Sequence, residues 1–198
     1  MLDAGLDLFA EQPVDAVAVD QIVARAGVAK GSFFNHFSDK ATFAAAVADA
    51  VRNDLEKCVA IANCGMPDPL ARLVNGMRVA AQFALEERRR TMVMLRAAGH
   101  QGGVHHPLNA GVSADIAAAV ASGHVRAEAA SWGVLYWLGL CQVLMADVAV
   151  RAPDRAEVSD ALLGMAALGL GGLGAAENIA SVIVCNAARL IHIESPGT

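Results

Sequence analysis

The stretch AVDQIVARAGVAKGSFFNHFSDK, residues 18–40, decides the fold of this chain. Its first part places apolar residues at the helical spacing i, i+3, i+4 and i+7, on Val19, Ile22, Val23 and Ala26. Gly27 follows where a helix end favours a residue that accepts a positive φ. Residues 30–37 then form a short segment that carries Ser, Asn and His. This pattern predicts a helix-turn-helix, whose second helix enters the DNA major groove.

The composition favours a globular helical protein. The chain has 198 residues, of which 56% are hydrophobic and 18% are charged, and its formal net charge is −5. This balance excludes a disordered tail or a coiled coil, and the length suits one or two small domains with a buried core. Only six prolines interrupt the chain, and no run of alternating β-branched residues occurs. We therefore expect an all-α fold.

The cysteines and the N-terminus indicate a reducing, cytoplasmic location. Cys58, Cys64, Cys141 and Cys185 are scattered without the spacing of metal ligands or of a disulfide framework. The N-terminus shows no basic segment followed by an apolar run, so we expect no secretory signal.

One stretch reaches the length of a membrane-spanning helix. Residues 129–146 contain no charge over 18 residues, and a bilayer core needs about 20 apolar residues. The stretch also contains Ser131 and Gln142, and no excess of lysine or arginine marks one side of it. A helix buried on all sides in a globular or dimeric core fits equally well. We expect no membrane partner and keep a membrane-associated protein as an alternative.

Breaks and helical periodicity divide the rest of the chain. The clearest break is GMPDP at residues 65–69, where Asp68 and Pro69 are typical of an N-cap and a first helical residue. Five glycines between residues 164 and 174 predict that a helix ends near 171–174, or that a second helix approaches closely there. We expect helices at 2–11, 40–62, 69–86, 88–98, 108–122, 126–150, 155–170 and 175–191, the helix-turn-helix at 18–37, a turn at 12–16 and a loop at 99–107.

At residues 22–43, IVARAGVAKGSFFNHFSDKATF, the chain resembles the TetR family of bacterial transcriptional regulators. The resemblance spans about residues 2–48 and includes the LFAEQ that ends the first predicted helix. It implies a small N-terminal three-helix DNA-binding domain, followed by a larger helical domain that binds a small ligand and dimerises. Ligand binding usually releases DNA in this family. We therefore expect a helix-turn-helix DNA-binding domain at 1–45 and an effector-binding and dimerisation domain at 46–198.

The resemblance and the chemistry of the motif select candidate DNA contacts. Lys30 and Lys40 start successive helices and can reach phosphates, and His36 matches a family histidine that donates to a phosphate. Asn and Ser side chains can contact base edges, and a phenylalanine can contact a thymine methyl group. Phe33 and Phe37 are expected to hold the helix in the core. The predicted DNA-binding residues are Lys30, Gly31, Ser32, Phe34, Asn35, His36 and Lys40.

The motif also departs from the family pattern. Val17 and Ala18 stand where a threonine pair is common, and Ala29 replaces the usual serine cap, so helix caps and phosphate contacts are lost. Residues 1–50 hold three Lys or Arg against seven Asp or Glu, a net charge of −4, whereas a DNA-binding head is normally basic on one face. We hypothesise that a basic segment precedes residue 1 in the full protein, which a salt titration of DNA affinity with and without that segment tests.

The predicted sensor surface lies on the helices from residue 69 onward. Small-molecule sites are concave and mainly apolar, with a few polar groups, and these helices supply methionine, aromatic and aliphatic side chains, among them Met94 and Trp137. An ordinary place in the core is the alternative for any one of them. The predicted ligand-binding residues are Met77, Phe83, Met92, Leu95, His100, Trp132, Tyr136 and Gln142.

Other site chemistries find no support in the sequence. His100, His105, His106 and His124 form no ligand set that we recognise, because adjacent histidines in a glycine-rich loop cannot easily share one ion, so we expect no metal and no cofactor. No Ser/His/Asp or Cys/His arrangement and no phosphate-binding glycine loop occurs, so we do not expect an enzyme.

The sequence therefore predicts a ligand-responsive DNA-binding regulator. The 126–150 helix is apolar nearly all round, and the glycine-rich 161–174 stretch admits a close helix, so we expect both in a homodimer interface. A two-fold dimer spaces its recognition helices about 34–36 Å apart and implies a near-palindromic operator. We expect a repressor that a small apolar effector releases from double-stranded operator DNA. The alternative is a helical small-molecule-binding or membrane-associated protein without tight DNA binding.

Overall fold

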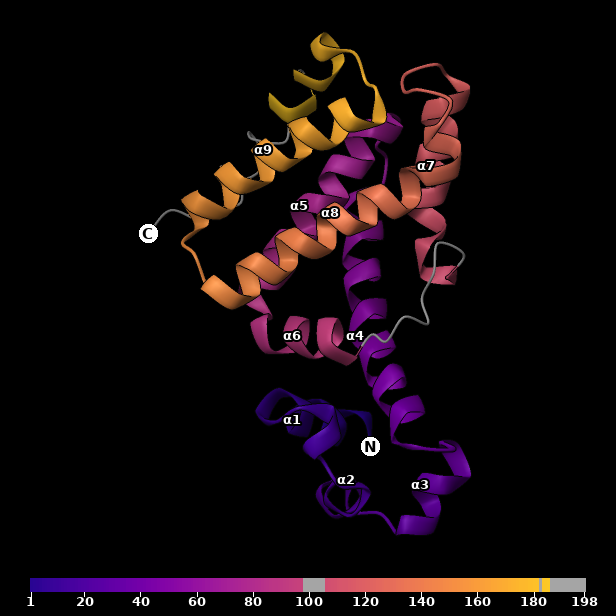
Figure 1. Ribbon diagram of the computed structural model, residues 1–198, viewed down its shortest axis with the longest axis vertical. Coiled ribbons are helices and arrows are strands. Elements are labelled where there is room, and N and C mark those ends of the chain that lie inside the picture. The colour runs from indigo at the N-terminus through magenta and orange to yellow at the C-terminus, as the bar shows by residue number, and fades with distance from the viewer. Residues whose placement is uncertain (98–105, 182, 186–198) are drawn as a thin grey trace.

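The structure is a computed structural model that describes residues 1–97, 106–181 and 183–185. These residues form helices and connecting loops, without a strand, which confirms the all-α prediction. A small head lies at one end of the molecule and a larger helical body at the other, joined by α4 (Figure 1). The helices are α1 (Leu2–Glu11), η1 (Val14–Ala16), α2 (Val19–Ala26), α3 (Lys30–His36), α4 (Lys40–Ala62), α5 (Pro69–Glu86), α6 (Arg88–Ala97), η2 (Pro107–Asn109), α7 (Ala110–Ala121), α8 (Ala129–Arg151) and α9 (Arg155–Leu173).

The head packs α1, α2, α3 and the first half of α4 around an aromatic centre. Phe43 lies at this centre, with the ring of Phe37 at 4.9 Å and that of Phe33 at 5.3 Å between centroids. Gly5 of α1 lies against the same ring, since a Cβ at Gly5 would stand 2.6 Å from Phe43 Cε1. Gly27 ends α2 with φ of 67°, the left-handed conformation expected there. The helix-turn-helix is therefore held by burial of a few large side chains.

Helix α4 belongs to both parts of the molecule. Asp39 caps it, because its Oδ1 accepts a hydrogen bond from the Thr42 N–H at 2.7 Å. This hydrogen bond, with one from Ser38, holds the pKa of Asp39 below its ordinary value. Phe43 and Val47 lie in the core of the head, whereas Leu55 lies in the core of the body. One continuous helix thus connects the two cores.

The body is built around α5, with α4, α7, α8 and α9 packed beside it and α6 lying between the body and α1 (Figure 1). Trp137 of α8 is 1% exposed and lies against α9 at Gly169, where a Cβ would stand 2.8 Å from its ring. Gly172 faces Tyr136 in the same way. The glycine-rich stretch thus lets α8 and α9 approach closely.

Most predicted helix bounds agree with the structure to within a few residues. Residues 14–16 form a 3-10 turn rather than a plain turn, and α7 starts at Ala110 instead of residue 108 because Pro107–Asn109 forms a separate 3-10 turn. Helix α9 ends at Leu173, followed by Gly174 with φ of 89°, as the glycines predicted. Most of the predicted loop at 99–107 lies outside the described residues. In the predicted last helix, residues 177–181 and 183–185 are helical, and 186–191 lie outside.

Candidate functional site

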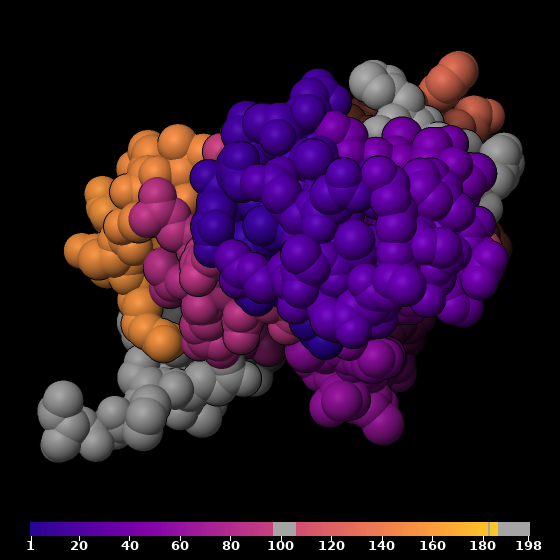
Figure 2. Space-filling view, turned by 90° about the horizontal axis from the view of Figure 1, so that it is seen from below, coloured from indigo at the N-terminus to yellow at the C-terminus, as the bar shows by residue number. Residues whose placement is uncertain are grey.

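Helix α3 divides into a buried face and an outer face. Phe33 is fully buried in the head, whereas the neighbouring Phe34 is 52% exposed. Gly31, Asn35 and His36 are exposed and Ser32 is half-buried, so the predicted base-reading residues lie on the outer face. Residues of the head fill most of the face seen from below the molecule (Figure 2). Their roles in DNA binding stay predictions.

The two predicted phosphate-binding lysines differ in what holds them. Lys30 Nζ lies 2.8 Å from Oδ1 of Asp20 in an exposed ion pair. Lys40 Nζ donates to the carbonyl oxygens of Asp15 at 2.9 Å and Val17 at 3.0 Å. Lys40 therefore ties the start of α4 to the turn before α2. Among the described residues, Lys30 pairs with a solvent-exposed carboxylate alone, which is a weak interaction.

The helix caps are reduced as the substitutions in the motif predicted. Ala18 and Ala29 precede α2 and α3 and offer no side-chain acceptor. Gln21 supplies half of a capping arrangement, because its Oε1 accepts the Ala18 N–H at 2.8 Å. The entry to α2 is thus stabilised by one side chain instead of two.

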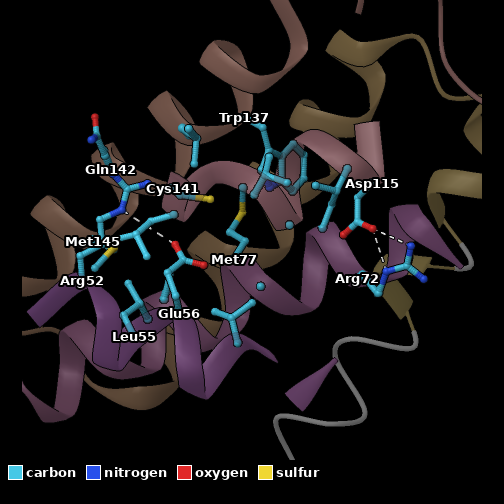
Figure 3. Close-up of a pocket in the computed structure, with 18 of the residues that line it drawn as sticks. Arg52, Leu55, Glu56, Arg72, Met77, Asp115, Trp137, Cys141, Gln142 and Met145 are labelled. Atoms are coloured by element: carbon cyan, nitrogen blue, oxygen red, sulfur yellow. Dashed lines mark hydrogen bonds and ion pairs between the residues drawn. The ribbon is translucent and has the colours of Figure 1, made fainter. Parts of the chain in front are cut away.

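A cavity of about 700 Å³ lies in the body between α4, α5, α6, α7 and α8 (Figure 3). Its volume falls in the range of small-molecule sites. Apolar side chains make up much of the wall, and polar groups interrupt it at a few points. The apolar lining includes Leu55, Leu73, Met77, Met94, Leu95, Trp137 and Met145, and the polar lining consists of Arg52, Glu56, Asn63, Arg72, Asp115, Cys141 and Gln142.

One polar group of the cavity is a bonded ion pair between α5 and α7. Arg72 donates to Oδ1 of Asp115 from Nε at 2.8 Å and from Nη2 at 2.5 Å. Its Nη1 donates to the backbone oxygens of Met66 and Pro67. Each guanidinium nitrogen of Arg72 therefore has a partner, whereas Oδ2 of Asp115 accepts no hydrogen bond from the described residues.

The second polar group comes from α4. Arg52 Nε lies 3.9 Å from Oε1 of Glu56, beyond hydrogen-bond distance, and Arg52 Nη2 donates to Oδ1 of Asn109. Burial raises the pKa of Glu56, which the Arg52 charge opposes. Burial also raises the pKa of the nearby Cys141 thiol to about 12, with the Glu56 charge adding to the shift. Cys141 is thus a neutral thiol rather than a nucleophile.

The structure brings only part of the predicted ligand-binding set to this cavity. Met77, Leu95 and Gln142 line it, together with Met94 and Trp137. The others lie elsewhere: Phe83 is buried beneath Arg90, Met92 is half-buried on α6, and Trp132 and Tyr136 lie outside the lining on α8. His100 lies outside the described residues. The ligand-binding roles of these residues stay predictions.

Sequence reasoning missed the charged lining of the cavity. Asp115 carries the only charge within α7, and a lone carboxylate on an otherwise uncharged helix is a signal that could have been read. Arg52 and Glu56 are spaced i, i+4 on a helix, which by itself is typical of a solvated surface pair. Only the folded structure, in which α4 packs against α5 and α6, shows that they line a cavity.

Two other kinds of site concern metal ions and membranes. Among residues 1–97, 106–181 and 183–185, no group of three or more His, Cys, Asp or Glu could hold a metal ion. Helices α8 and α9 are long and apolar enough to cross a membrane by length and composition, with a third of each span buried in this fold. The core helices of a water-soluble protein pass the same test, so this finding is weak evidence.

Comparison with known proteins assigns the head. Residues 1–47 match the family model of bacterial regulatory proteins of the tetR family. A curated relative, the HTH-type transcriptional repressor DhaR of Mycobacterium sp. (strain GP1), is 34% identical over 77 residues. The aligned stretch covers 38% of this chain and 38% of DhaR.

Solved structures share the fold of nearly the whole chain. A putative tetR family transcription regulator from Shewanella sp. PV-4 aligns with a TM-score of 0.72 at 17% identity, over 87% of this chain and 95% of that one. RolR, solved in complex with the ligand resorcinol, aligns with a TM-score of 0.63 at 21% identity, over 92% of this chain and 90% of its own. At these identities the likeness is one of fold, whereas the match of residues 1–47 to the tetR family model is one of sequence and covers the head of the molecule.

Proposed function

We propose that this chain is a transcriptional repressor that binds operator DNA through α3 and releases it when a small molecule fills the cavity of the body. The observation that carries the proposal is that α4 contributes side chains both to the core of the head and to the body. Val47 lies in the core of the head, and Leu55 and Glu56 line the cavity less than three turns away. Two conformations of the protein that differ in the placement of α4 would differ in the placement of the head. A ligand that binds one of these conformations more tightly than the other would therefore shift the head.

The comparisons support the two halves of this proposal. DhaR is a transcriptional repressor, and RolR is a protein of the same fold that binds resorcinol. A cavity of about 700 Å³ with a mainly apolar wall is suited to a ligand of moderate size. We assign DNA binding to residues 1–45 and effector binding to 46–198, with α4 continuous across that boundary.

The outer faces of α8 and α9 support a homodimer. Trp132 is 69% exposed and Leu168 is 74% exposed, and Val143 and Val150 are exposed on the same pair of helices. A second copy would bury these side chains across a two-fold axis and present two α3 helices to a near-palindromic operator. We place this dimer in the cytoplasm, without enzymatic activity and without a membrane partner.

The test of the function begins with the DNA sequence. Selection of duplexes from a random library by the purified chain, followed by fluorescence anisotropy on the enriched duplex, measures affinity. We expect an enriched near-palindrome, and binding that weakens steeply with salt because phosphate contacts release counterions. Failure of the chain to enrich any sequence would overturn the proposal.

A membrane-associated protein is the second candidate, because α8 and α9 are each long and apolar enough to span a bilayer. In that case lipid, rather than a second copy of the chain, would cover the outer faces of α8 and α9. Purification without detergent separates the two. A chain that stays in the aqueous fraction as a discrete dimer supports the repressor, and a chain that needs detergent supports the membrane protein.

A further inference from the structure

The cavity carries carboxylate oxygens that accept no hydrogen bond from the described residues at two separate places. Glu56 of α4 accepts no hydrogen bond from the described residues, and Oδ2 of Asp115 on α7 accepts none either. Figure 3 shows Glu56 and Asp115 on opposite sides of the cavity, with Met77 and Trp137 between them. A ligand therefore meets a hydrogen-bond acceptor, an apolar stretch and a second acceptor.

The charges around these acceptors disfavour an anionic ligand. Both guanidinium groups of the lining already have partners: Arg72 bonds Asp115 and two backbone carbonyl groups, and Arg52 donates to Asn109 and lies beside Glu56. An anion would have to break one of these arrangements while facing two carboxylates. The cost of burying an unpaired charge weighs against that exchange.

A cationic ligand gains little for a related reason. Each carboxylate of the lining has an arginine beside it, so Arg52, Arg72, Glu56 and Asp115 sum to zero formal charge. Burial also disfavours the charged form of Glu56. The acceptors remain available to an uncharged donor, and a hydroxyl group satisfies a carboxylate oxygen without adding charge to the cavity.

We infer that the cavity selects an uncharged molecule with a hydroxyl group at each end of an apolar body, one bonded to Glu56 and the other to Oδ2 of Asp115. The inference rests on the proposed function, whose effector it describes. The apolar body packs between Met77 and Trp137. Glu56 lies on α4, so the hydroxyl that it accepts touches the helix that carries the head.

The test uses three probe series with the full chain in the absence of DNA. These are alkane diols of increasing length with a hydroxyl at each end, alcohols of the same lengths with one hydroxyl, and the matching fatty acids. Isothermal titration calorimetry gives the affinities. At the length that spans the two acceptors, we expect the diol to bind about tenfold more tightly than the alcohol and the fatty acid, since an unmet buried acceptor costs affinity.

Variants at α4 assign the effect to one residue. Glu56→Leu removes the acceptor and is expected to reduce the diol to the affinity of the alcohol, and Glu56→Gln, which keeps a carbonyl oxygen, is expected to restore part of the preference. Lys57→Leu introduces the same side chain at the next position, where the lysine is exposed, and is expected to leave the preference unchanged. Circular dichroism of each variant shows whether it is folded.

Three results would overturn the inference: alcohols that bind as tightly as diols at every length, fatty acids that bind most tightly, or no measurable binding by any diol. A diol preference that survives in folded Glu56→Leu would contradict the role of Glu56. These outcomes are independent of the operator. A chain that prefers diols but enriches no DNA sequence would refute the proposed repressor and leave the inferred ligand chemistry intact. A chain that enriches a DNA sequence but shows no preference for diols would support the repressor and refute the inferred ligand chemistry.

Discussion

At the scale of single residues, Lys30 is a proposed phosphate contact that already has a partner in the head. Its Nζ lies 2.8 Å from Oδ1 of Asp20 in an exposed pair, which a phosphate would have to replace. We predict that Asp20→Asn raises affinity for the selected duplex several-fold, because it frees Lys30 and removes a negative charge from the head. Asp3→Asn removes the same charge from α1 without freeing Lys30 and serves as the control in the anisotropy titration. Equal affinities for the two variants would contradict this view of Lys30.

The buried carboxyl group of Glu56 should make the stability of the fold depend on pH. Burial raises its pKa in the folded chain above the ordinary value of 4.5. Between that value and the raised one, the folded state holds the proton more tightly than the unfolded state, so stability falls as pH rises through this window. We predict that Glu56→Gln raises the melting temperature at pH 7 more than at pH 4, whereas Glu87→Gln, on the exposed surface, shows no such difference. A gain that is the same at both pH values would contradict the prediction.

At the scale of elements, the contact between α8 and α9 depends on where the glycines of α9 lie. Gly169 faces the buried ring of Trp137, but Gly164 has open space around its position. We predict that Gly169→Ala destabilises the fold by about 1–3 kcal/mol through overpacking. Gly164→Ala on the same helix should instead stabilise it by up to about 1 kcal/mol. Urea unfolding measures both, and a Gly169→Ala variant as stable as Gly164→Ala would show that α8 and α9 are not packed this closely.

The helices of the head could be predicted from the sequence, but the cavity between the helices of the body could not. The head could be predicted because its sequence signals are local. Gly27 ends α2, Phe33 lies in the short helix α3, and Phe37 follows that helix directly. The cavity could not, because Arg72 and Asp115 lie 43 residues apart and meet only when α5 packs against α7. Helical periodicity shows that a residue is on an apolar face, but it does not show whether that face meets a helix or a cavity.

At the scale of the whole molecule, the apolar outer faces of α8 and α9 predict a dimer. Leu168 is 74% exposed on α9, and we expect Leu168→Glu to place a charge in the interface and yield a monomer. Light scattering should then give the chain mass of 20.4 kDa for the variant and twice that for the wild type. Ile61→Glu is the control, since Ile61 is 77% exposed on α4, and it should remain dimeric. A monomeric wild type, or a dimeric Leu168→Glu, would contradict this interface.

Helix α3 is the proposed DNA-binding surface, and one titration tests this role directly. Fluorescence anisotropy with the duplex that the chain selects compares the wild type with Lys30→Ala across a range of salt concentrations. We predict saturable binding by the wild type, a loss of about tenfold or more in the variant, and a salt dependence that is shallower by about one counterion. Equal affinity and equal salt dependence for the two proteins, both folded, would contradict the central claim.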